Sequence, residues 1–277
     1  MKSVAMLPTL LTLGNTFCGF LAIAKVGDAL MLEAADTEVF RSRMMAAAGL
    51  ILLAMVFDAL DGRIARLTRH STDFGAQLDS LTDLITFGVA PAFLAKVLCE
   101  HSFLAVGHTY RPKFILMLAV LFVVCAALRL ARFTLETVPD EEAHKRFKGL
   151  PSPAAAGVVA SSVIFYFNVI VPRTSSDFAL AFTRVLPFTL PVLGLLMVSR
   201  IPYVHVVGRF LGGRQPFVYV VQVVFLALLI LVFHEWMPLL EILLLAAFVG
   251  YTLSGCVAFA IRRLVHRHAE SPRAGTK

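Results

Sequence analysis

Eight long apolar segments follow one another along the chain, separated by shorter polar stretches. A helix of about 20 residues crosses a hydrocarbon core of roughly 30 Å, and each segment is long enough for this. Backbone groups cannot stay unpaired in lipid, and the short alternating segments of a β-barrel do not occur, so we predict an all-α, polytopic membrane bundle of about eight helices, with six to eight allowed. The predicted spans lie near Leu7–Val26, Met44–Leu67, Ser71–Cys99, Phe114–Phe133, Pro151–Val171, Phe178–Ser199, Gln215–Phe233 and Pro238–Ile261.

The overall composition agrees with this pattern. Of the 277 residues, 58% are hydrophobic and 16% are charged, whereas a soluble domain carries about 25% charged residues. We expect one transmembrane domain over residues 1–261, followed by a basic tail over 262–277. The first span ends in small residues, as a signal peptide does, but seven further spans follow and we expect it to be retained. The four cysteines lie far apart, so we expect packing residues rather than disulfides or metal ligands.

Lysine and arginine are unevenly divided between the predicted loops. With a cytosolic N-terminus, 17 of the 25 lie on the cytosolic side, and flipping the protein would reverse the bias. We therefore expect both termini in the cytosol, residues 27–42 as an external loop and residues 134–149 as a cytosolic one. This bias also explains the net charge of +7, so the charge suits anionic membrane lipids and does not indicate nucleic acid.

Four acidic residues are predicted to converge where the second and third spans meet. Asp58 and Asp61 are three residues apart, and Asp79 and Asp83 are four apart, so each pair shares one face of its helix. The connection near residues 68–73 is short, which makes the two helices antiparallel neighbours. The four carboxylates are then expected to meet near the cytosolic membrane boundary.

Converging carboxylates in a membrane require a cation. An acidic residue at the centre of a span costs roughly 2.5–3.5 kcal/mol, and neighbouring carboxylates repel one another. Oxygen-only ligands favour Mg²⁺, Mn²⁺ or Ca²⁺ over Zn²⁺, and this set has room for two ions that clamp a phosphoryl group. A divalent metal transporter is the non-enzyme alternative, but transporters scatter polar residues over several spans near mid-membrane.

Small and basic residues flank the acids. Gly62, Ala65 and Gly75 leave room for a flat group to approach closely. The alternative is ordinary helix packing, for which membrane proteins also use small residues. Arg66 is a candidate for holding a phosphate through charge-assisted hydrogen bonds, or it anchors the topology.

The pattern D-x2-D-G-x2-A-R-x8-G-x3-D-x3-D, from Asp58 to Asp83, resembles the signature of the CDP-alcohol phosphotransferases without departure. The resemblance implies a membrane-embedded homodimer whose site opens to the cytosolic leaflet. It implies Mg²⁺ or Mn²⁺ held by the four acids, and a CDP-linked lipid whose cytidine lies against the small residues. It also implies that Asp83 is the general base.

Three further stretches resemble one branch of that family, the phosphatidylserine synthases of bacteria and archaea. They are residues 7–15, 128–133 and 147–156, with a departure at Thr134, where the branch has Asn. This resemblance implies transfer of the phosphatidyl group from CDP-diacylglycerol to L-serine in a prokaryotic inner membrane, with CMP released. The same chemistry on glycerol 3-phosphate or inositol phosphate remains the alternative.

Serine differs from other alcohols in its carboxylate and ammonium groups. Arg129, Arg132 and Lys148 are candidates for binding the carboxylate, the arginines in bidentate fashion. Asn15 and Ser152 can serve the same cavity through hydrogen bonds. The competing interpretations are cytosolic topology for the basic residues, a helix–helix contact for Asn15 and a helix start for Ser152.

Overall fold

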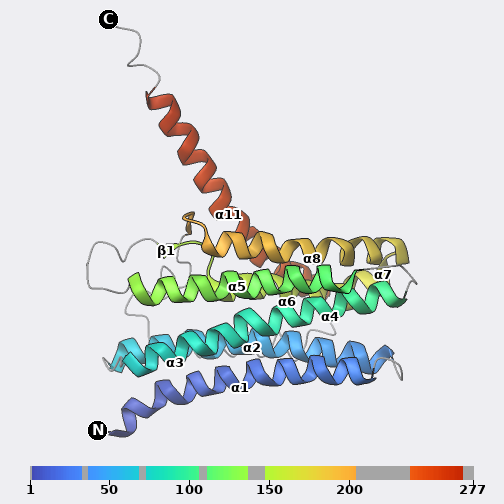
Figure 1. The fold of residues 1–277 in the computed structure, drawn as a ribbon, viewed down its shortest axis with the longest axis horizontal. Helices are drawn as coiled ribbons and strands as arrows, with labels where there is room; N and C mark the ends of the chain where they lie inside the picture. Colours follow the sequence, from blue (N-terminus) through green and yellow to red (C-terminus); the bar gives the residue numbers. More distant parts are fainter. Residues whose placement is uncertain are drawn as a thin grey trace, which may run out of the picture.

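The computed structural model describes residues 2–32, 37–68, 73–105, 111–136, 147–203 and 238–270. In these ranges the chain forms a bundle of long helices that run side by side (Figure 1). Seven helical segments of the described chain are long and apolar enough to cross a membrane. The prediction of a helical integral membrane protein is therefore confirmed, while the predicted span Gln215–Phe233 lies outside the described residues.

Two of the spans contain a π-helical segment between α-helical parts. The third span consists of α3, η1 and α4, and the fifth consists of α6, η3 and α7. The bounds are α1 Lys2–Leu32, α2 Thr37–Thr68, α3 Asp73–Asp83, η1 Leu84–Val89, α4 Ala90–Ala105, α5 Pro112–Glu136, β1 Phe147–Lys148, α6 Ser152–Phe165, η3 Tyr166–Ile170, α7 Val171–Arg173, α8 Ser176–Val198, β2 Pro202–Tyr203 and α11 Pro238–Glu270. α11 thus continues as a helix beyond Ile261, where we expected the basic tail to begin.

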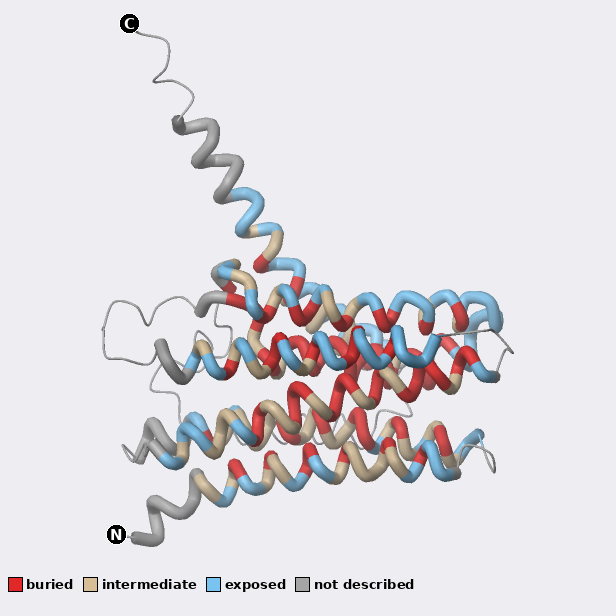
Figure 2. Tube along the Cα trace, viewed as in Figure 1, coloured by how far each residue is buried: buried red, intermediate tan, exposed pale blue. Residues whose placement is uncertain are grey.

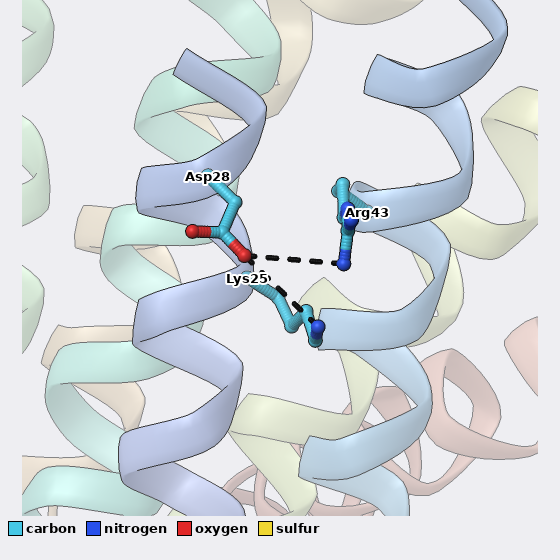
Figure 3. A network of polar contacts seen from close by, with 3 residues as sticks. All are labelled: Lys25, Asp28 and Arg43. Carbon is cyan, nitrogen blue, oxygen red and sulfur yellow. Dashed lines mark ion pairs between the residues drawn. The ribbon is translucent and has the colours of Figure 1, made fainter. Parts of the chain in front are cut away.

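The loop predicted over residues 27–42 was too long, because α1 runs to Leu32 and α2 begins at Thr37. Charged side chains hold these helical ends together, as Figure 3 shows. The Asp28 carboxylate lies 4.0 Å from the Lys25 ammonium and 3.9 Å from the Arg43 guanidinium. Hydropathy ends a predicted span where the apolar residues stop. A helix can nevertheless continue into polar residues, and an ion pair one turn apart within the helix, such as Lys25–Asp28, favours this.

The core of the bundle lies around α6 and α4 (Figure 2). In the most apolar window of the span that contains α6, 72% of the residues are buried, against 11% for α11. Small residues make this central position possible, because they let neighbouring helices approach closely. At Gly157 of α6, a side chain would collide with the Phe248 ring of α11. The four cysteines are free, and the burial of Cys18, Cys99 and Cys125 agrees with the expected packing role.

A short antiparallel pair, β1 with β2, fastens the start of α6 to the end of α8. The Gly149 amide donates to the Ile201 carbonyl at 2.9 Å, and the Leu150 amide donates to the Leu196 carbonyl at 3.0 Å. Gly149 has φ of +94°, and a side chain there would collide with the Met197 carbonyl. Only glycine adopts this conformation without strain, so the residue fixes where α6 begins.

Candidate active site

Three of the four predicted acids come together where α2 and α3 meet. One carboxylate oxygen from each of Asp58, Asp61 and Asp79 lies within 4.8 Å of the other two. Asp61 is 5% exposed, and the other two are half-buried. One oxygen of Asp79 is buried and has no hydrogen-bond partner within the described part of the chain. An all-oxygen group with an orphaned buried oxygen fits a hard divalent cation.

Asp83 lies one turn after Asp79 and stands beside the group of three. It is 9% exposed, and it accepts a hydrogen bond of 3.5 Å from the Asn15 amide nitrogen. It is close enough to Asp58 and Asp79 for their charges to interact. The fourth acid therefore shares the electrostatic environment of the cluster, while one of its oxygens is held from α1.

The Asn15 side chain is fully buried between α1 and the third span. Its backbone carbonyl accepts a hydrogen bond of 3.3 Å from the Thr86 hydroxyl. Its amide oxygen is buried and has no partner among the described residues. The amide therefore binds Asp83 through its nitrogen and keeps an acceptor available beside the same carboxylate.

Two threonines of α1 extend this polar contact, and neither was singled out by the sequence. Thr12 donates to Asp61 Oδ2 at 3.0 Å, and the hydroxyls of Thr16 and Thr82 lie 2.7 Å apart. Thr12 precedes Asn15 by three residues, so the two share one face of α1. This spacing was the signal that could have identified Thr12.

Helices α5 and α6 bring a cation to the acid cluster. Arg129 Nη1 donates to the Ser152 hydroxyl at 2.8 Å, and Ser152 is fully buried at the first turn of α6. Arg129 is half-buried and close enough to Asp58, Asp83 and Tyr251 for electrostatic interaction. Tyr251 lies on α11, far along the sequence, and no sequence pattern pointed to it.

The other two basic candidates are less fully described. Arg132 is half-buried and lies three residues after Arg129 on α5. Lys148 belongs to β1, but its side chain lies outside the described part of the structure. Among the residues predicted for the acceptor, Asn15 therefore contacts the cluster directly, and Arg129 lies near it and is joined to Ser152.

Comparison with known proteins identifies the family. A family model described as CDP-alcohol phosphatidyltransferase matches residues 5–198, which include the acid cluster, Arg129 and Ser152. The chain belongs to the CDP-alcohol phosphatidyltransferase family. Its identification from the sequence pattern is thereby confirmed.

Several curated relatives carry the name of one activity. CDP-diacylglycerol–serine O-phosphatidyltransferase of Helicobacter pylori is 32% identical over 71% of this chain and 70% of its own length. The protein of the same name from Methanocaldococcus jannaschii is 43% identical over 39% of this chain and 45% of its own. Archaetidylserine synthase of Methanothermobacter thermautotrophicus is 34% identical over 73% of this chain and 71% of its own.

The small residues of the family signature lie on both sides of the acids. Gly62 is exposed, and a side chain there would meet none of the described atoms within 4 Å, so this part of the structure leaves space for a ligand beside Asp61. Gly75 is half-buried on α3. Ala65 and Arg66 belong to the last turns of α2, but their side chains lie outside the described part.

Proposed function

We propose that this protein transfers the phosphatidyl group of CDP-diacylglycerol to the hydroxyl of L-serine, giving phosphatidylserine and CMP. The relatives of the same family that carry this activity in their names support the proposal. The observation that carries it is the convergence of Asp58, Asp61 and Asp79 beside Asp83. Carboxylates at this spacing could hold divalent cations, and such cations neutralise the negative charge of a pyrophosphate during reaction.

Asp58, Asp61, Asp79 and Asp83 are the proposed ligands of a divalent cation, Mg²⁺ or Mn²⁺, and they suffice for two ions. When bound, such ions neutralise the pyrophosphate and stabilise the charge that develops on the departing CMP. Within the described residues the orphaned oxygen of Asp79 supports this assignment, since a buried carboxylate oxygen without a donor is costly.

Asp83 is the proposed general base. It takes the proton of the serine hydroxyl while the serine oxygen attacks the phosphorus that carries diacylglycerol. A new P–O bond forms to serine, the P–O bond to CMP breaks, and CMP leaves with the electron pair. The contact from Asn15 supports this role, because it restricts the orientation of the Asp83 carboxylate.

The CDP-lipid is proposed to bind at the meeting of α2 and α3. The open space at Gly62 supports a close approach of the cytidine, and Ala65 and Gly75 are the other small residues assigned to it. Arg66 is assigned to a phosphate of the same ligand, through charge-assisted hydrogen bonds.

The acceptor is proposed to bind between α1 and α5. Arg129, oriented by Ser152, is assigned to the serine carboxylate, which a guanidinium can bind in bidentate fashion. The buried amide oxygen of Asn15 is an acceptor suited to the serine ammonium. Arg132 and Lys148 are also proposed to interact with the serine carboxylate.

We further propose that residues 1–261 form one catalytic domain, that the protein is a homodimer in a prokaryotic inner membrane, and that both termini and the site face the cytosol. The distribution of Lys and Arg supports this orientation. Serine and CDP-activated lipid would then reach the site from the same side.

One assay tests the activity. Purified protein receives CDP-diacylglycerol, Mg²⁺ or Mn²⁺ and one alcohol at a time, and CMP release is measured. Serine should support turnover, and glycerol 3-phosphate and inositol phosphate should not. Turnover with a phosphorylated alcohol alone would assign a different acceptor, and metal uptake into vesicles without CMP release would indicate a transporter.

A further inference from the structure

Hydroxyl groups in these apolar spans commonly donate to the carbonyl of the preceding turn. Ser102, Ser161 and Thr252 do so in α4, α6 and α11. The Thr12 hydroxyl donates to a side chain of another helix, the carboxylate of Asp61, 49 positions later in the chain. Thr12 is 6% exposed and Asp61 is 5% exposed, so this hydrogen bond is sheltered from water.

The contact matters because Asp61 stands among other carboxylates. Mutual repulsion would turn these side chains away from one another when no cation is bound. A donor fixed on α1 restrains the Asp61 carboxylate, and its remaining lone pairs can still ligate an ion. Hydrogen bonds of this kind, made to a ligand from outside the metal, orient it and tune its affinity.

The position of α1 is itself closely defined. At Gly19 a side chain would collide with the Thr86 hydroxyl, and at Gly14 it would lie 3.5 Å from the Phe57 ring. These glycines let α1 pack tightly against α2 and η1. Thr12 is therefore presented to Asp61 by a helix whose distance and rotation are set by packing on either side.

We propose that Thr12 is a positioning residue for the cation site: its hydroxyl holds the Asp61 carboxylate in the orientation in which it ligates a divalent ion. The inference rests on the proposed metal site and adds to it a residue outside the acidic signature. It also gives α1 a defined part in the chemistry, although α1 contributes no acid to the cluster.

Thr16 offers a matched control, one turn further along α1. Its hydroxyl lies 2.7 Å from the Thr82 hydroxyl and donates to the Thr12 carbonyl at 3.1 Å. Thr12→Val and Thr16→Val each remove one hydroxyl from the same helix face and keep the shape of the side chain. Only the first change removes a donor to a proposed ligand, so a general loss of helix packing should affect both variants alike.

The test measures binding of Mn²⁺ alone to the purified full-length protein in detergent, by the loss of the free-ion signal in electron paramagnetic resonance. Thr12→Val should weaken Mn²⁺ binding by about 10- to 100-fold, the range for lost partners of metal ligands. Thr12→Ser keeps the hydroxyl and should retain most of the affinity. Thr16→Val should bind Mn²⁺ as the unmodified protein does. If Thr12→Val does not fold, Thr12→Ala is compared with Thr12→Ser.

The outcomes separate this inference from the proposed function. Unchanged Mn²⁺ affinity in Thr12→Val, or an equal loss in Thr16→Val, overturns the role of Thr12 and leaves the metal site intact. If the unmodified protein binds no Mn²⁺, or if Asp79→Asn does not abolish the binding, the proposed metal site is wrong. The role of Thr12 is then refuted with it. Weakening confined to the Thr12 variants that lack a hydroxyl supports the inference.

Discussion

Replacing Arg129 tests the acceptor site most directly. Its guanidinium is half-buried, is held by a hydrogen bond of 2.8 Å to the buried Ser152 hydroxyl, and faces the acid cluster. A charge-assisted contact with the serine carboxylate is worth roughly 1.5–3 kcal/mol, so Arg129→Ala should raise the KM for serine about 10- to 150-fold. The KM for CDP-diacylglycerol should change far less, because the nucleotide is proposed to bind where α2 and α3 meet and not at Arg129.

Two further variants resolve how Arg129 acts. Arg129→Lys should recover only part of the loss, because an ammonium cannot form a bidentate contact. Ser152→Ala removes the orienting acceptor but keeps the charge, so the KM for serine should rise by only about 2- to 10-fold, as for a lost neutral partner. In an Arg129→Ala background, Ser152→Ala should add little, since the two residues act as one unit.

The assay is the initial rate of CMP release against serine concentration at saturating CDP-diacylglycerol. Lys113→Ala is the control, because it removes one positive charge from the exposed opposite end of α5. If Arg129→Ala folds, releases CMP and shows the serine dependence of the unmodified protein, Arg129 does not bind the acceptor. Serine recognition would then have to be sought around Asn15.

Three other predictions concern the metal site, the orientation and the fold. Each single Asp→Asn change in the cluster should abolish CMP release while expression stays intact; the variants are Asp58→Asn, Asp61→Asn, Asp79→Asn and Asp83→Asn. Near-normal turnover of two such variants in saturating Mg²⁺ or Mn²⁺ would refute the proposed metal site. In a background without native cysteines, an impermeant thiol reagent added from outside should label Ala35→Cys but not Glu270→Cys, and the reverse pattern would invert the proposed orientation. Gly149→Ala should destabilise the protein by at least about 1–2 kcal/mol and lower its melting temperature. Gly27→Ala lies inside α1, where the added side chain meets none of the described atoms within 4 Å, so it should not lower the melting temperature, because alanine favours a helix over glycine. A Gly149→Ala variant that melts with the unmodified protein would show that the conformation of Gly149 is not required.

The spans could be predicted because every segment that crosses lipid must follow one rule: it is apolar and satisfies its own backbone hydrogen bonds. The rule gives no information where the chain leaves the lipid. The segment over residues 27–42 was assigned to a loop because it is polar, yet α1 continues to Leu32 and α2 begins at Thr37, with Asp28 paired to Lys25 within α1 and to Arg43 of α2. The β1–β2 pair was also missed, since two residues per strand leave no periodicity to detect.

The acid cluster could be predicted because spacing within a helix and one short turn determine it. Contacts between helices distant in sequence depend on how each helix is rotated, which the sequence alone does not define. Thr12 opposite Asp61 and Tyr251 near Arg129 are contacts of this kind. Asn15 was predicted to form hydrogen bonds in the acceptor cavity, but its contact with Asp83 depends on the packing of α1.

The π-helical segment η1 determines how the residues before it are oriented relative to the residues after it in the third span. A π-helical turn takes up one residue more than an α-helical turn, and each residue of an α-helix turns the chain by about 100°. Asp79 and Asp83 precede this segment, while the buried face of α4, with Leu94 and Leu98, follows it. The extra residue thus shifts the acidic face relative to the apolar face within one continuous helix. Deleting a single residue from η1 would remove the π-helical turn and leave the two faces in their present relation. A regular α-helix over the undeleted residues would instead rotate the carboxylates by about 100° relative to the buried face of α4, with every ligand still present in the sequence.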